Sequence, residues 1–351
     1  MDIEISYLKN LIVHRNNKNI KKNKKKDEKE FNIINKYDFF CENNIKTNEL
    51  IEKIQNSKDY FILIDEIESI KIRDIDNYND IELIGETDKY VLIKYNLNNF
   101  SYFIDFFKSL PNPRLFIYHI IDSYNHILEG LNILFNNNIY LFDLTNRNII
   151  FDNTLKPKII NYELALHSDI KKCNFIDILK KCNNYTLKPI ELHLLFYIYN
   201  NNIEYISSSF ISEIIDTFVK NMPFFELFSL KYKEQYKKES LHFFNSFINK
   251  PKDYIYDEII RYKYTWSNYS LSIIYLYIVG NVIKNLNIKN TIINKILLIL
   301  NKNINPNPNK REKINETINK MDILFGEYNN WDFIKSFNDV DLKYQNLINN
   351  L

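Results

Sequence analysis

Residues 141–150 have the sequence L-F-D-L-T-N-R-N-I-I, the most informative segment of the chain. Its polar positions include Asp143 and Asn148, which lie five residues apart in the pattern D-L-x-x-x-N-I. Thirteen residues after Asn148, a second segment, N-Y-E-L-A, occupies positions 161–165. From the order and spacing of the two segments we expect Asp143 and Asn148 to lie on one loop, with side chains that converge beside Asn161.

The regions around these segments differ in their hydrophobic patterns. Short β-branched or aromatic runs at 60–64, 67–72 and 90–95 predict strands. Between 115 and 135, apolar residues recur three or four positions apart, which predicts a helix with one buried face. The run from 266 to 282 is apolar on nearly all sides and predicts a fully buried helix. The pattern therefore favours strands before residue 96 and helices after it.

The segment D-L-x-x-x-N-I resembles the catalytic loop of eukaryotic-type protein kinases, and N-Y-E-L-A stands where that family has D-F-G-L-A. The resemblance implies that Asp143 is the catalytic base that accepts the proton of the substrate hydroxyl. It also implies that Asn148 binds magnesium, together with Asn161 and Glu163. Asn161 replaces the family's metal-binding Asp, and an amide oxygen brings no negative charge to a cation that favours carboxylates.

Three further segments resemble kinase motifs in the family's order. The sequence P-I-E, which ends at Glu191, resembles the A-P-E motif, and N-P-N-P-N-K-R, which ends at Arg311, resembles the motif before the last helix. The resemblance implies a buried ion pair between Glu191 and Arg311. The sequence W-S-N-Y-S-L-S at 266–272 resembles the start of the central buried helix. Ser267 occupies the position of the Asp that supports the family's catalytic loop.

The strand at 90–95 resembles the one that leads into the kinase hinge. This resemblance implies that Ile93 lies at the back of an adenine pocket and that the backbones of Lys94 and Asn96 face the adenine edge. An ordinary core strand is the alternative interpretation. The expected cofactors are ATP and magnesium if nucleotide binding is retained, and otherwise none.

Several charged or glycine-rich parts of the kinase pattern are missing. The chain has only four glycines and no G-x-G-x-x-G loop, which brings backbone close to phosphate. No V-A-I-K motif occurs; Lys71 is the nearest substitute, with Glu49 or Glu52 as its candidate partner on a helix. Thr145 stands where the family has a lysine beside the base. Because phosphoryl transfer depends on positioning and charge neutralisation, these losses count against activity.

Composition restricts the compartment and the partners. A net charge of +2 gives no global attraction to nucleic acid or acidic lipid. The three cysteines form no C-x-x-C, and no apolar run is long enough to cross a bilayer. We expect a cytoplasmic protein with a protein partner or substrate and no membrane contact; the resemblance to viral kinase-like proteins given below implies the host cytoplasm or the virion. Nucleic acid is expected only through the basic segment 14–30, for which a solvated segment is the favoured interpretation in this Lys-rich chain.

The prediction for the fold is an α+β protein with a protein-kinase-like bilobal arrangement, a reduced β-rich N-lobe and a mostly helical C-lobe. Residues 1–58 would form an N-terminal extension with the basic segment, and residues 59–96 the N-lobe. Residues 97–325 would form the C-lobe, with an insertion at about 200–262, and residues 326–351 a tail. Aromatic residues of the insertion fit a core, with a protein-binding face as the alternative.

The favoured function is that of a pseudokinase, a binding or scaffold module with little or no phosphotransfer. One alternative is an atypical active Ser/Thr-type kinase that uses ATP and magnesium. Another is a purely structural or interaction protein without nucleotide binding. The Asn-rich composition, with K-P-x-E and W-x-x-Y-S, also resembles uncharacterised kinase-like proteins of large DNA viruses.

Overall fold

The computed structural model describes residues 11–13, 31–70, 89–95, 97, 99–181, 187–286 and 292–327. They form an α+β protein with many helices and two small antiparallel sheets. The chain divides into two compact units. The first unit comprises Met1–Phe103 with Asn148–Ala165, and the second Ile104–Arg147 with Leu166–Leu351. The predicted boundary at residue 96 therefore has to be corrected, because 148–165 belongs with the strands.

A four-stranded sheet with the order β1-β2-β4-β3 forms the frame of the first unit. Its strands are β1 (Leu11–Val13), β2 (Phe31–Lys36), β3 (Ile64–Ile70) and β4 (Tyr90–Tyr95). Every neighbouring pair is antiparallel. Ile33 lies opposite Ile93 in the register, and both are buried in a core that includes Cys41. Alternation along the strands thus directs these side chains to one face of the sheet.

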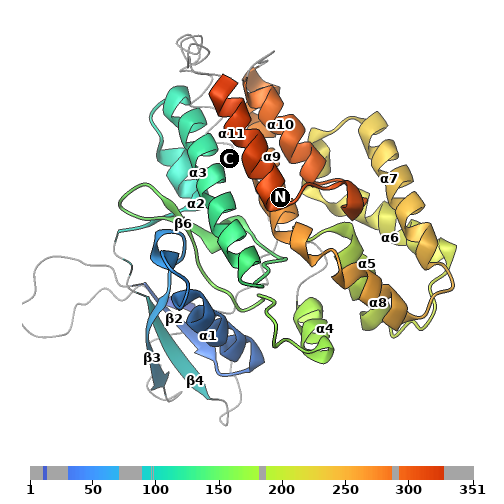
Figure 1. Cartoon of the computed structure of the whole chain (residues 1–351), viewed down its shortest axis with the longest axis horizontal. Coiled ribbons are helices and arrows are strands. Elements are labelled where there is room, and N and C mark those ends of the chain that lie inside the picture. The colour runs from blue at the N-terminus through green and yellow to red at the C-terminus, as the bar shows by residue number, and fades with distance from the viewer. Residues whose placement is uncertain are drawn as a thin grey trace, which may run out of the picture. The chain divides into compact units, whose positions relative to one another are not determined.

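Helix α1 (Phe39–Glu52) follows β2 and lies across the sheet (Figure 1). It begins at Asp38, whose Oδ1 accepts hydrogen bonds from the N–H groups of Phe40 and Cys41 at 2.9 and 3.0 Å. Residues 31–52 were expected to belong to an N-terminal extension. They instead supply a strand and the helix that covers the sheet, so this expectation was wrong. The basic segment 14–30 lies outside the described residues.

A second, three-stranded sheet belongs to the same unit. Its order is β5-β6-β7, with β5 (Ser101–Tyr102), β6 (Ile149–Phe151) and β7 (Pro157–Ile159). The single-turn helices η1 (Ser57–Asp59) and η3 (Asn146–Asn148) precede β3 and β6. Ile159 pairs with Phe61, which connects β7 to the segment that leads into β3.

The second unit is helical. Its first five helices are α2 (Phe103–Ser109), α3 (Pro113–Asn136), α4 (Lys172–Lys181), α5 (Ile190–Asn200) and α6 (Ser208–Asn221). The others are α7 (Leu230–Phe244), α8 (Lys252–Ile260), α9 (Trp266–Leu286), α10 (Ile292–Asn303) and α11 (Ile314–Glu327). Short 3₁₀ turns are η4 (Pro223–Leu227), η5 (Asn245–Phe247), η6 (Lys263–Thr265) and η7 (Pro308–Lys310).

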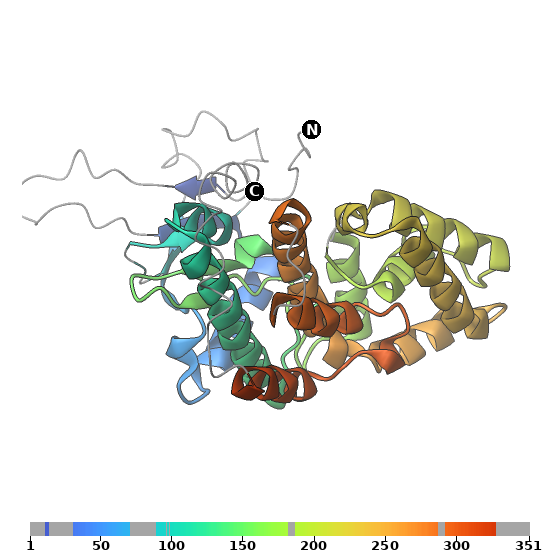
Figure 2. The same ribbon diagram turned by 90° about the horizontal axis from the view of Figure 1, so that it is seen from above.

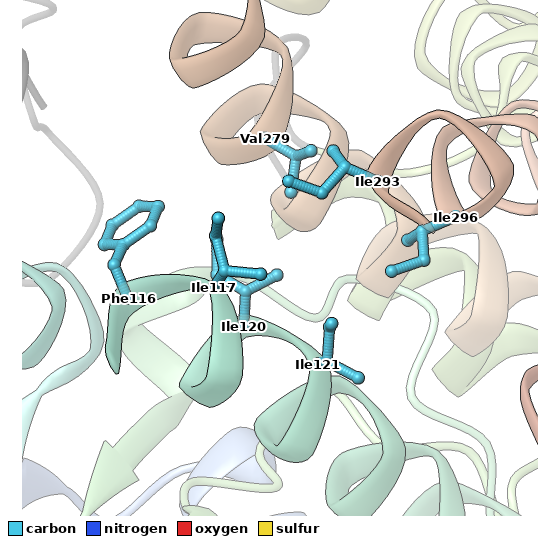
Figure 3. A pocket seen from close by; sticks show the side chains of 7 residues that line it. All are labelled: Phe116, Ile117, Ile120, Ile121, Val279, Ile293 and Ile296. Atoms are coloured by element: carbon cyan, nitrogen blue, oxygen red, sulfur yellow. The ribbon is translucent and has the colours of Figure 1, made fainter. Parts of the chain in front are cut away.

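Helix α9 is the centre of this unit and packs against α3 and α10 (Figures 1 and 2). Residues 266–276 are all buried, as the apolar run predicts. Helix α3 begins at Asn112, whose Oδ1 accepts a hydrogen bond from the Leu115 N–H at 2.9 Å. Where α3, α9 and α10 meet, a small pocket has an entirely apolar lining (Figure 3). The lining consists of Phe116, Ile117, Ile120, Ile121, Val279, Ile293 and Ile296.

Helices α6 to α8 have an aromatic core of their own. Phe218 stacks on Tyr236 with ring centroids 6.1 Å apart, and Phe224 stacks on Phe225 at 4.3 Å. All four side chains are buried. These rings therefore stabilise this group of helices from within, as expected for aromatic residues of a core. In the part of the chain that the structure describes, no helix has the length and apolar character needed to cross a membrane.

Candidate functional site

The start of α9 holds the segment that leads to Asp143. The Leu141 N–H donates to Ser267 Oγ at 3.1 Å, and Ser270 Oγ donates to the Phe142 carbonyl at 3.3 Å. All four of these residues are buried. A serine hydroxyl at position 267 thus accepts a backbone hydrogen bond from the loop, and the lack of an Asp there does not leave the loop without support.

Packing fixes the same segment further. Phe142 is fully buried and makes edge-to-face contacts with Phe175 and Trp266, at centroid distances of 5.8 and 6.1 Å. Tyr140 and Leu166 exchange two backbone hydrogen bonds of 2.8 and 2.9 Å. Asp143 itself is half-buried. The candidate catalytic base therefore follows directly after a rigid, well-packed stretch of the second unit.

The predicted metal ligands lie together in the first unit. Asn148 Nδ2 donates to the carbonyls of Ile160 and Asn161 at 3.3 and 3.4 Å, and the Ile160 N–H donates to the Asn148 carbonyl at 2.9 Å. Asn161 has φ 66°, in the left-handed region that Asn tolerates. Its Oδ1 accepts a hydrogen bond from the Glu163 N–H at 3.3 Å and so closes a local turn. Asp143 belongs to the second unit, so its convergence with these residues stays a prediction.

Two asparagines of α1 hold the backbone of residues 161–165. Asn43 Nδ2 donates to the carbonyls of Glu163 and Ala165 at 2.9 and 3.0 Å. Asn44 Oδ1 accepts a hydrogen bond from the Tyr162 N–H at 2.8 Å. Both asparagines are buried. This contact between α1 and the segment was not predicted, because single asparagines carry no signal in a chain so rich in them.

The polar groups buried in the first unit are neutral. Among its described residues they are Asn35, Asn43, Asn44, Thr47, Asn48 and Ser57. Glu49 and Glu52, the candidate partners for a strand lysine, are both exposed on α1, and Lys71 lies outside the described residues. Burial raises the pKa of the Tyr95 and Tyr162 hydroxyls, so both stay uncharged at neutral pH.

The residues expected at an adenine pocket have different positions in the structure. Ile93 is completely buried in the core between the sheet and α1. Lys94 lies in the middle strand, opposite Asn32 on one side and Glu66 on the other, and its Nζ lies 3.0 Å from Glu66 Oε2. Its backbone groups point toward neighbouring strands. The expectation that they face a nucleotide was therefore wrong. Asn96 lies outside the described residues.

Glu191 and Arg311, which the motifs imply as partners, form a bidentate ion pair. Arg311 Nη1 and Nη2 lie 2.5 and 2.8 Å from Glu191 Oε1 and Oε2. Trp266 Nε1 also donates to Oε1 at 3.1 Å, and Arg311 Nε donates to the Asn305 carbonyl at 2.7 Å. Burial lowers the pKa of Arg311, but the charge and hydrogen bonds of Glu191 outweigh it and raise that pKa. The pair links α5 to the segment before α11.

The donors near Asn161 fit a magnesium ion poorly. Of Asn148, Asn161 and Glu163, only Glu163 has a carboxylate, and Asn161 Oδ1 is engaged in its own turn. Magnesium favours carboxylate oxygens over neutral amides. Within the described ranges, no group of three or more His, Cys, Asp or Glu side chains could hold a metal ion. In comparisons with known proteins, no family model and no curated protein matches this chain.

Proposed function

We propose that the chain is a pseudokinase: a kinase-like module that binds a protein partner and transfers phosphate feebly or not at all. The division into a sheet-bearing unit and a helical unit supports a bilobal kinase-like fold. So does the order of β2, α1, β3 and β4 before the long helix α3. The Glu191–Arg311 pair supports it independently, because the two residues were paired from kinase-like motifs 120 positions apart in the chain.

The observation that carries the proposal is the neutral contact between α1 and residues 161–165. A protein kinase needs a lysine of one strand paired with a glutamate of the adjoining helix to position ATP phosphates. Here the buried face of α1 carries Asn43, Asn44 and Asn48, which bind backbone groups. Lys36 ends β2 just before α1, the order in which the family has its lysine, and its side chain is exposed. The helix thus stabilises the segment without supplying charge.

The amide at position 161 acts in the same direction. Phosphoryl transfer needs cations that neutralise the transferred group, and the protein must hold them. Asn161 adds no charge, and its side chain closes a local turn. We therefore infer a structural role for this segment. A protein-binding role makes use of this rigid frame and requires none of the missing charges.

A second candidate, an atypical active kinase, is favoured by one observation. Ser267 and Ser270 anchor the residues directly before Asp143, so the carboxylate of a catalytic base is retained on a fixed backbone. The third candidate, an interaction protein without nucleotide binding, is favoured by Lys94, whose backbone groups are directed at the sheet. The anchored loop supports the kinase-like fold of the pseudokinase proposal. The neutral contacts of α1 support its second part, the expectation of little or no phosphotransfer.

The melting temperature with ATP, in magnesium and in EDTA, tests this proposal. A ligand at 100 times its Kd stabilises the native state by about 2.7 kcal/mol, which a melting curve resolves easily. We expect no shift that requires magnesium. Asn161→Asp is the matched variant: on a kinase-like frame, the added carboxylate creates a magnesium-dependent shift that the wild type lacks. A large magnesium-dependent shift in the wild type would favour the active kinase.

A further inference from the structure

The edge strand of the four-stranded sheet borders an open groove. Among the described strands, β3 pairs with β4 alone, and its residues 65–69 are all exposed. Between β3 and α1 lies a groove of about 240 Å³. Ile45, Asn48, Glu49 and Glu52 line one wall at helical spacing, and residues 63–67 of the chain line the other. The groove therefore runs beside a row of backbone groups that a further strand could pair with.

This edge is strongly acidic. Five carboxylates belong to it: Glu49, Glu52, Asp65, Glu66 and Glu68. Lys94 lies among them, with its Nζ 3.0 Å from Glu66 and closer still to Glu68. Among the described residues, none that lines the groove is basic. Like charges opposite one another destabilise strand pairing, so the edge repels the same strand of a second copy and favours a basic one.

The side chains of the edge alternate in character. Ile67 lies opposite Ile93, on the face that carries α1, and is 40% exposed. Glu66 and Glu68 point to the opposite face, where both contact Lys94. Asp65 lies at the register shift, so regular pairing with β4 extends over Glu66–Ile70. On one face, a strand added here would contact the carboxylates of Glu66 and Glu68. On the other face it would contact Ile67, beside the glutamates of α1.

We propose that β3 and the groove beside it bind an extended, basic segment of a partner protein by strand addition. Backbone hydrogen bonds to β3 would supply affinity, as in other cases of β-augmentation. Lysine or arginine at alternate positions would face Glu66 and Glu68, and aliphatic residues between them would cover Ile67. The surface lies wholly within the first unit and requires neither nucleotide nor phosphotransfer, so it stands apart from the pseudokinase proposal.

A labelled dodecapeptide of alternating lysine and valine is the probe, and fluorescence anisotropy with the full chain is the measurement. We expect binding that weakens with salt, none for the glutamate–valine counterpart, and protection of the β3 amides from hydrogen exchange. N-methylation of alternate residues keeps the charge and removes backbone donors, so it should weaken binding at least about tenfold. If the methylated peptide bound as tightly as the unmethylated one, charge attraction alone would explain the binding, and the proposal would be overturned.

Paired variants locate the site. Glu49→Gln with Glu52→Gln should weaken binding about fivefold to tenfold, as expected for two partly exposed ion pairs. Glu42→Gln with Glu213→Gln removes the same charge from exposed positions elsewhere and should change nothing. Equal loss in both variants would overturn the proposal. Dimerisation through β3 would show that a second copy occupies the edge. Peptide binding only after the lysines of 21–26 are changed to glutamine would show that the chain's own basic segment occupies it. Either result would overturn the assignment to a partner protein.

Discussion

Replacing Glu191 with glutamine removes one charge of a buried pair and keeps the shape of the side chain. The two side chains are 0% and 1% exposed, and Arg311 would keep its hydrogen bond to the Asn305 carbonyl and its position over the Tyr269 ring. Removing one partner of such a pair costs about 3–5 kcal/mol, because the other charge stays buried without compensation. We expect the lower half of that range, since the remaining contacts hold the guanidinium.

Urea unfolding followed by tryptophan fluorescence measures this loss, and Trp266 reports on it directly because its Nε1 donates to Glu191. The partly exposed pair of Lys310 and Glu239, 3.3 Å apart, is the control: Glu239→Gln should cost about 1 kcal/mol or less. Glu191→Gln combined with Arg311→Met should lose much less than the sum of the two single variants. Strictly additive losses, or a single loss as small as that of the control, would refute the reasoning.

Three other variants test the frame by the same urea assay. Ser267→Ala leaves the buried Leu141 N–H without its acceptor and should cost about 1–3 kcal/mol; unchanged hydrogen exchange at 141–147 would contradict this. Asn44→Leu should cost a similar amount, about 1–3 kcal/mol, because the Tyr162 N–H loses its partner; a neutral effect would show that α1 does not hold the segment. Ile296→Ala should cost about 2–5 kcal/mol, whereas Leu298→Ala, two positions away and 70% exposed, should stay within about 0.5 kcal/mol; equal effects would contradict the packing of α10.

The strong apolar patterns of the helical unit made it predictable from the sequence. The buried run of α9 and the one-sided pattern of α3 correspond to elements of the structure. The pairing of Glu191 with Arg311 could be predicted from the sequence because each residue lies in a segment that resembles a known motif. The role of Ser267 was not predictable for a physical reason: a hydroxyl can accept a backbone hydrogen bond, but the residue type alone does not show whether it does.

The first unit was harder to predict. The buried face of α1 is formed largely by Asn43, Asn44, Thr47 and Asn48, so hydrophobic periodicity does not reveal a helix there. A helix was expected only around Glu49 and Glu52, so the full extent of α1 was not predicted and β2 was left in an extension. The backbone of Lys94 was misjudged because pairing on both sides of a strand depends on contacts far apart in the chain, which local sequence does not encode.

Phosphate transfer from radiolabelled ATP, measured on the purified chain with magnesium and a general protein substrate, tests the central claim most directly. Relative to the kinase pattern, Asn161 lacks one charge and Thr145 lacks another. Two such losses, at about 2–4 kcal/mol each, would slow transfer by roughly three to six orders of magnitude. Asp143→Ala is the control, because it removes the candidate base and leaves the anchored backbone before it. We predict that wild type and Asp143→Ala give the same background of label. Robust turnover that disappears in Asp143→Ala would contradict the pseudokinase account and establish an active kinase.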